Sequence, residues 1–275
     1  MSTRRTHCIT TTDSVTIGGT VHGRGPSLVF LQGGVGDGDL DWQALVAHLR
    51  NRFTCYLPSL RGRGLSDDHA DLSTGRQVED VLAFVDSIGA PTGLVGWSYG
   101  AGLALAVAAQ SDAVTAVSSY EPVMLSQMDE QEQAAAGDAA ARAAELAADG
   151  ELAAAVRAFV GWPFTDDDIA GAEKAGYFEA AARYISRLLD HLQQNVESDD
   201  PVGDPAVLGA IAVPVLVLTG SETKPLFTTS AQYVVDHVPH ARVREIQGAG
   251  HAAPLTHPEA LAEALVEVFA PAQLA

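Results

Sequence analysis

A serine at position 98 lies between two glycines in the pattern Gly-x-Ser-x-Gly, here Gly96-Trp97-Ser98-Tyr99-Gly100. The apolar run Gly93-Leu94-Val95 before it predicts a strand, and the small and aliphatic residues 101–109 after it predict a helix. A serine on such a sharp strand-to-helix turn is a nucleophile elbow, which holds the hydroxyl clear of the backbone. The helix N-terminus beneath it favours developing negative charge. We therefore predict that Ser98 is a nucleophile; the plainer alternative is a turn with two ordinary glycines.

A serine hydroxyl needs a base to take its proton. The chain has nine histidines, and His251 is the best candidate because it lies in the loop Gly248-Ala249-Gly250-His251. This loop follows the last predicted strand and precedes the last predicted helix, so its imidazole can reach the elbow. The other histidines are expected on helices, on an N-terminal hairpin or in other loops. The alternative is a loop histidine without a role.

The negative oxygen that forms when serine attacks a carbonyl needs hydrogen-bond donors. One donor is expected to be the backbone N–H of Tyr99, the residue after the nucleophile. The other is expected in the glycine-rich loop after a buried strand at 27–31, at Gly34 in Gln32-Gly33-Gly34. Glycines there let a substrate oxygen approach the backbone, although they could equally mark a tight turn.

Two carboxylates stand at the ends of predicted strands, and either could orient His251. Glu121 ends the strand after the elbow helix, and Glu222 follows a strand predicted over 213–219. Both fit the order serine, acid, histidine. Lys224 would partly neutralise Glu222, whereas a carboxylate on a buried strand end is costly unless it has a partner such as a histidine. We therefore favour Glu121 as the acid and keep Glu222 as the alternative.

Two other polar stretches resemble binding motifs. Asp37-Gly38-Asp39-Leu40-Asp41 begins like a calcium loop, but Trp42 and His48 stand where that loop needs glycine and glutamate, so an acidic helix N-terminus is expected. Arg61-Gly62-Arg63-Gly64 is expected to be a structural loop. No dinucleotide or nucleoside-triphosphate motif occurs, and we expect neither a cofactor nor a metal.

Strand and helix patterns alternate along most of the chain. Residues 6–12 and 15–21 predict an antiparallel hairpin, and further strands are predicted over 27–31, 53–57, 113–120, 213–219 and 242–246. Helices are predicted over 40–49, 74–88, 228–237 and from 256 to 269, the second and last opening with capping boxes at Thr74 and Thr256. This alternation implies a mostly parallel sheet with helices on both faces.

Between 125 and 204 no strand pattern appears, and helices are predicted over 129–148, 151–160, 167–175 and 177–196. Helices inserted between two strands are expected to form a cap above the carboxyl edge of the sheet, where ligands of such sheets bind. We therefore predict a core domain of residues 1–124 and 205–275 and a cap domain of residues 125–204. The cap aromatics Trp162 and Tyr177 are candidate substrate-binding residues, which favours an apolar substrate.

The composition narrows the possible partners. The 275 residues include 35 acids and 16 bases, a formal net charge of -19. Such a surface repels nucleic acid and anionic membranes, so neither is an expected partner. Two cysteines in strand patterns indicate buried thiols rather than a disulfide framework, and no signal peptide or membrane span is evident. We expect a cytoplasmic monomer or homodimer that acts on a small molecule.

The motifs above together resemble the α/β-hydrolase superfamily over nearly the whole chain. The elbow at Ser98, the loops at 32–36 and 61–66, and His251 before the last helix match in order and spacing. The resemblance implies an α/β-hydrolase fold with an eight-stranded sheet whose second strand is antiparallel. It also implies a hydrolase with a serine–acid–histidine triad.

Three positions depart from the pattern of that superfamily. Gln32 stands in place of a usual histidine, Ser59 in place of a usual aspartate, and Thr223 in place of the usual acid after the 213–219 strand. The last departure favours Glu121. The segment Tyr120-Glu121-Pro122 is similar to zearalenone-type lactonases, which take their glutamate from the strand after the elbow helix.

The sequence thus predicts a serine hydrolase that cleaves a carboxylic ester or lactone of an apolar small molecule through an acyl-enzyme. One alternative is a carbon–carbon bond hydrolase or a cyclase that uses the same site on a polyketide-like substrate. Another is a ligand-binding homologue with slow turnover.

Overall fold

The computed structural model describes residues 5–195 and 202–270. Eight strands form one sheet in the order β1-β2-β4-β3-β5-β6-β7-β8. β2 runs antiparallel to β1 and β4, and the other neighbouring strands are parallel. The predicted sheet is confirmed, including its antiparallel second strand. The strands are β1 (Arg5–Thr10), β2 (Thr16–Gly23), β3 (Ser27–Leu31), β4 (Thr54–Pro58), β5 (Thr92–Trp97), β6 (Val114–Tyr120), β7 (Val215–Gly220) and β8 (Ala241–Ile246).

Helices cover both faces of the sheet because successive side chains of each buried strand point to opposite sides. In β3, Leu28 and Phe30 pack into one apolar cluster, whereas Val29 and Leu31 pack into another. The first cluster is covered by α1 (Gly38–Leu49), α11 (Ala253–Thr256) and α12 (Pro258–Phe269). The second is covered by α2 (Thr74–Ile88), α3 (Tyr99–Ala108), α9 (Pro205–Gly209) and α10 (Pro225–His237).

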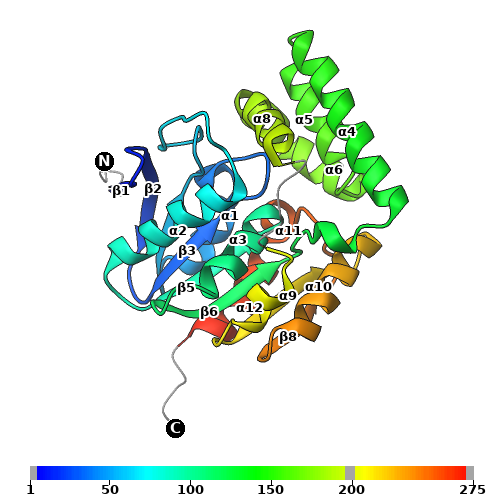
Figure 1. The fold of residues 1–275 in the computed structure, drawn as a ribbon. Coiled ribbons are helices and arrows are strands. Elements are labelled where there is room, and N and C mark those ends of the chain that lie inside the picture. Colours follow the sequence, from blue (N-terminus) through cyan, green and yellow to red (C-terminus); the bar gives the residue numbers. More distant parts are fainter. Residues whose placement is uncertain (1–4, 196–201, 271–275) are drawn as a thin grey trace.

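The segment between β6 and β7 contributes only helices to the described structure. We call its described helical part, residues 125–195, the helical insert. Figure 1 shows its helices gathered together, with the arrow of β6 pointing towards them. It comprises η1 (Leu125–Gln127), α4 (Glu130–Ala148), α5 (Leu152–Val160), α6 (Asp166–Lys174), α7 (Tyr177–Ala181), η2 (Ala182–Tyr184) and α8 (Ile185–Asn195). The predicted cap, residues 125–204, includes residues 196–201, which lie outside the described residues, and the domain division stays a prediction.

The helix predicted over 177–196 is wrong as a single element. The chain turns through a 3₁₀ segment at Ala182–Tyr184 before α8 begins, and Val196 lies outside the described residues. The hydroxyl of Tyr177 donates to Asp41, and that of Tyr184 donates to Asp37, at 3.0 and 2.5 Å. These two anchors to the start of α1 are tertiary contacts that helical periodicity does not reveal.

Two predicted capping boxes are also wrong. α2 begins at Thr74, but its N-cap is Ser73, and the Thr74 hydroxyl bonds to the side chain of Asn195 instead. The Thr256 hydroxyl donates to the carbonyl of Ala252, while His257 is the N-cap of α12. In both cases the threonine hydroxyl has a competing acceptor close by, so the capping interaction is replaced.

Two compositional expectations have different outcomes. Cys55 is buried as predicted, but Cys8 is exposed, because it lies on β1 at the outer edge of the sheet. Both are free thiols. Within the described residues, no helix combines the length and apolar character needed to cross a membrane.

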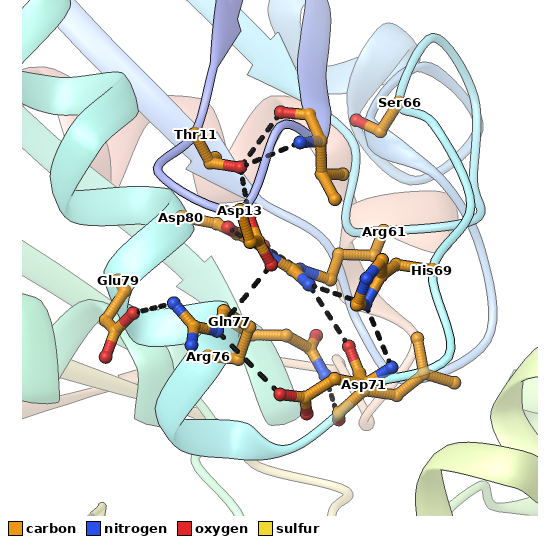
Figure 2. A network of polar contacts seen from close by, with 12 residues as sticks. Thr11, Asp13, Arg61, Ser66, His69, Asp71, Arg76, Gln77, Glu79 and Asp80 are labelled. Atoms are coloured by element: carbon orange, nitrogen blue, oxygen red, sulfur yellow. Dashed lines mark hydrogen bonds and ion pairs between the residues drawn. The ribbon is translucent and has the colours of Figure 1, made fainter.

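The guanidinium of Arg61 is the centre of a polar network between the loop after β4, the β1–β2 turn and α2 (Figure 2). It donates to both carboxylate oxygens of Asp80 on α2, at 2.5 and 2.7 Å, and pairs with Asp13 in the β1–β2 turn at 2.8 Å. The Arg61 side chain is fully buried, so the bidentate pair with Asp80 offsets the loss of its hydration. The network ties the loop after β4 to α2 and to the hairpin.

Candidate active site

Ser98 lies at the turn between β5 and α3 with φ 56° and ψ -117°, a backbone conformation that residues with a side chain rarely adopt. The flanking glycines allow this turn. A Cβ on Gly96 would lie 2.2 Å from the carbonyl oxygen of Gly100, and one on Gly100 would lie 2.3 Å from that of Gln32. Neither position accepts a larger residue without a backbone shift. The geometry is therefore that of the predicted elbow.

The structure brings Glu121 to His251. Glu121 follows the end of β6, is fully buried, and its Oε2 lies 2.7 Å from Nδ1 of His251. The same carboxylate accepts the backbone N–H of Gly220 at 2.7 Å and the hydroxyl of Thr223 at 2.9 Å. Glu222 is exposed, and its carboxylate accepts from Ser221. Of the two predicted acids, only Glu121 is thus bonded to the histidine.

Two hydrogen bonds to backbone carbonyls and a stacked ring hold the loop of His251 in place. Trp97 Nε1 donates to the carbonyl of His251 at 2.8 Å, and the Tyr120 hydroxyl donates to that of Gly250 at 2.5 Å. The ring of Phe227 stacks on the imidazole with centroids 3.9 Å apart. Because Nδ1 donates to Glu121, Nε2 is the nitrogen that carries the lone pair. His251 is therefore set up to accept a proton at Nε2.

The predicted oxyanion loop is held by two residues that the sequence interpretation missed. The N–H of Gly33 donates to Asp41 at 2.8 Å, and Arg63 donates to the carbonyls of Gly34 and Gly36 at 2.6 and 3.1 Å. Burial raises the pKa of Asp41 to about 7, although the hydrogen bond from Gly33 acts in the opposite direction. Their only sequence signals were the acidic stretch at 37–41 and the Arg-Gly repeat at 61–64.

Ser98 and His251 border the same cavity, which has a volume of about 380 Å³. Gly34 and Tyr99, the expected oxyanion residues, also border it, and so do the predicted substrate-binding residues Trp162 and Tyr177. The hydroxyl of Tyr177 is engaged by Asp41. The remaining wall is mostly apolar and comes largely from the helical insert, with Leu125, Met128, Ala140, Phe159, Val160, Phe164, Leu188 and Leu192.

One part of the cavity wall is polar, formed by Thr74, His191 and Asn195. His191 is buried, and its Nδ1 lies 2.8 Å from the carbonyl oxygen of Leu72. Burial lowers the pKa of His191 to about 4, so its imidazole is uncharged at neutral pH. No lysine or arginine is among the described residues that border the cavity. The described part of the wall therefore offers hydrogen bonds but no positive charge.

The sequence was compared with models of protein families. The model of the alpha/beta hydrolase family matches residues 21–264, most of the sequence. The chain belongs to the alpha/beta hydrolase family. In this alpha/beta hydrolase, Thr223 occupies the position where the resemblance led us to expect an acid, and its hydroxyl supports the carboxylate of Glu121 instead.

Solved structures share the fold of this alpha/beta hydrolase. An alpha/beta hydrolase from Sphaerobacter thermophilus is 26% identical with a TM-score of 0.79, over 96% of this chain and 100% of that one. The 2-hydroxy-6-oxo-6-phenylhexa-2,4-dienoate hydrolase of a Rhodococcus strain is 23% identical with a TM-score of 0.72, over 96% and 99% of the two chains.

Among curated proteins, a pyrrolizixenacetamide deacetylase from Xenorhabdus hominickii is 33% identical over 91 residues. This match spans 32% of the present chain and 34% of that protein, about a third of each.

Proposed function

We propose that this alpha/beta hydrolase cleaves a carboxylic ester or lactone of a neutral, apolar small molecule, with Ser98 as nucleophile, His251 as base and Glu121 as acid. The observation that carries this proposal is the buried Glu121–His251 pair, 2.7 Å apart, whose histidine borders the same mostly apolar cavity as the strained Ser98. A buried carboxylate bonded to Nδ1 both orients the imidazole and stabilises its cation.

In the proposed reaction, the Ser98 hydroxyl oxygen attacks the carbonyl carbon while Nε2 of His251 takes the hydroxyl proton. The N–H groups of Gly34 and Tyr99 stabilise the negative oxygen of the tetrahedral intermediate. His251 then gives the proton to the leaving alkoxide as the carbon–oxygen bond breaks. Water attacks the acyl-enzyme by the same route, with His251 as base, and releases the carboxylic acid and the serine.

The charge of the cavity wall supports a neutral substrate. A carboxylate bound against this wall would lose its hydration without a cation to pair with, because His191 is uncharged and the described wall has no lysine or arginine. The Rhodococcus enzyme named above acts, by its name, on a dienoate, which carries such a carboxylate. We therefore favour ester or lactone cleavage over carbon–carbon cleavage of a dienoate. The Xenorhabdus relative is named a deacetylase, an enzyme that removes an acyl group.

A fluorophosphonate probe and two matched esters test the proposal. We expect the probe to label Ser98 and to abolish turnover, and Ser98→Ala to remove both labelling and turnover. 4-Nitrophenyl butyrate and the 4-nitrophenyl monoester of succinate differ in acyl charge but are similar in length. We expect the neutral ester to have a kcat/KM at least about tenfold higher, corresponding to about 1.4 kcal/mol. Turnover by Ser98→Ala at the wild-type rate would overturn the mechanism, and equal use of both esters would overturn the neutral-substrate proposal.

A further inference from the structure

The loop that carries His251 is held from the helical insert by a carboxylate that the proposed mechanism does not use. Asp168 lies in the first turn of α6 and is 3% exposed. Its two oxygens accept the backbone N–H groups of His251 and Ala252, at 3.0 and 3.1 Å. Thr165, the N-cap of α6, donates its own N–H and its hydroxyl to the same carboxylate, at 3.1 and 3.0 Å. Four donors thus bond to one buried carboxylate, and two of them belong to residues 251–252 of the loop that carries His251.

The loop is shaped to receive this carboxylate. A Cβ on Gly250 would lie 2.4 Å from Oδ2 of Asp168 and 2.7 Å from Oδ1. Gly250 does not have a positive φ, so a glycine is needed at this position because the carboxylate lies so close, and not because of the backbone conformation. The hydrogen bond from the N–H of His251 to Asp168 joins residues 83 positions apart in the sequence.

Helix capping alone does not explain the position of Asp168. In α4, Glu132 occupies the equivalent place in a capping box, where it accepts the N–H of the N-cap residue Asp129 at 3.0 Å. Among the described residues, the side chain of Glu132 is bonded only to its own capping residue, whereas Asp168 is buried against a loop of the core. Glu132 is therefore a matched reference for the capping contribution of Asp168.

We propose that Asp168 is a positioning residue, which fixes the backbone of residues 251–252 from the helical insert so that the imidazole of His251 stays aligned with Ser98 and Glu121. The carbonyl of His251 is bonded to Trp97 and its N–H to Asp168, so both of its backbone polar groups are held. A misplacement of a catalytic group by about 1 Å can lower a rate about 100-fold. This inference rests on the proposed function.

Two like-for-like substitutions test the proposal. Asp168→Asn keeps the shape of the side chain but leaves only one oxygen to accept N–H groups, whereas Glu132→Gln makes the same change at the reference position. We expect Asp168→Asn to lower kcat for 4-nitrophenyl butyrate about 10- to 100-fold with KM within about twofold. The rate of phosphonate labelling at Ser98 should fall by the same factor. Glu132→Gln should leave both unchanged.

A double-variant cycle distinguishes the positioning role of Asp168 from a general loss of structure. Gly250→Ala should lower kcat at least about tenfold in the wild type, because its Cβ displaces the carboxylate. In Asp168→Ala the Cβ has room, so adding Gly250→Ala should cause no further loss. If the losses in kcat from Gly250→Ala and Asp168→Ala instead multiplied in the double variant, the proposal would be overturned. A wild-type kcat in an Asp168→Asn protein whose thermal melt shows that it is folded would also overturn it. If Ser98→Ala retained turnover, the proposed function itself would fail; if only Asp168→Asn behaved as wild type, the positioning role alone would fail.

Discussion

Replacing Glu121 by glutamine tests the assignment of the acid with little change in packing. The carboxylate accepts from Gly220, Thr223 and His251, and the first of these donors is a backbone N–H that cannot reverse its role. The amide oxygen of a glutamine must therefore face Gly220, which turns its NH₂ group towards the imidazole. His251 then has to accept at Nδ1, so its hydrogen moves to Nε2 and the lone pair needed for catalysis is lost.

The size of the expected effect follows from this change of tautomer. The corresponding acid-to-amide substitution in serine–histidine–acid triads lowers kcat about 10⁴-fold. That factor corresponds to about 5.5 kcal/mol of lost transition-state stabilisation. Glu222→Gln should leave kcat within about twofold, because Glu222 is exposed and bonded to Ser221.

The assay compares kcat for 4-nitrophenyl butyrate and the rate of phosphonate labelling at Ser98 in both variants. Thermal melts provide the folded fraction by which each rate is divided. A Glu121→Gln enzyme within tenfold of wild type would refute the reasoning. A loss of kcat in Glu222→Gln but not in Glu121→Gln would identify Glu222, after β7, as the acid.

Three further substitutions test other parts of the structure. In the Glu121→Ala enzyme, the additional change Thr223→Asp should raise kcat at least about tenfold. The Thr223 hydroxyl is hydrogen-bonded to the same Glu121 oxygen as His251, so a carboxylate at position 223 can occupy the space left by Glu121. Asp41→Asn should flatten the pH dependence of stability. Burial raises the pKa of Asp41 from 3.8 to about 7, so the stability due to its protonated form is complete below about pH 4 and is lost as the pH rises to about 7, on the order of 4 kcal/mol. Urea unfolding of wild type and variant at pH 5 and pH 8 measures the difference, and parallel pH profiles would contradict it. Arg61→Ala should lower the free energy of unfolding by about 3–5 kcal/mol, since it leaves Asp80 buried without its partner, whereas Arg61→Met combined with Asp80→Leu should recover most of that loss in the same urea assay.

Local patterns were enough to predict most of the fold. Apolar runs and the glycines and helix signals between them located the eight strands to within about two residues at most boundaries, because buried strands and helices require these periodicities. They failed where a tertiary contact replaced a local one. The helix predicted over 177–196 is interrupted beside Tyr184, which bonds to Asp37, and Thr74 is bonded to Asn195 instead of capping α2.

The candidate site shows the same division. The elbow at Ser98 could be predicted because it depends on glycines two residues away. Asp41, Asp168 and His191 could not be, because each looks like an ordinary residue of its own helix. Their positions at the oxyanion loop, the histidine loop and the cavity wall depend on how helices far apart in the chain pack together.

The sequence by itself determined that a strained serine turn lies in a mostly parallel sheet and that His251 follows the last strand. Only the tertiary structure shows which of the two candidate acids is bonded to His251. Glu121 and Glu222 follow β6 and β7, which are neighbours in the sheet, so chain order and strand ends do not separate them. The N–H of Glu121 is bonded to the carbonyl of Leu218, and its positive φ of 46° belongs to the same turn, whereas Glu222 lies two residues beyond β7 in an exposed loop. The 2.7 Å contact joins residues 130 positions apart, and such a contact depends on strand register and packing, which no local periodicity encodes.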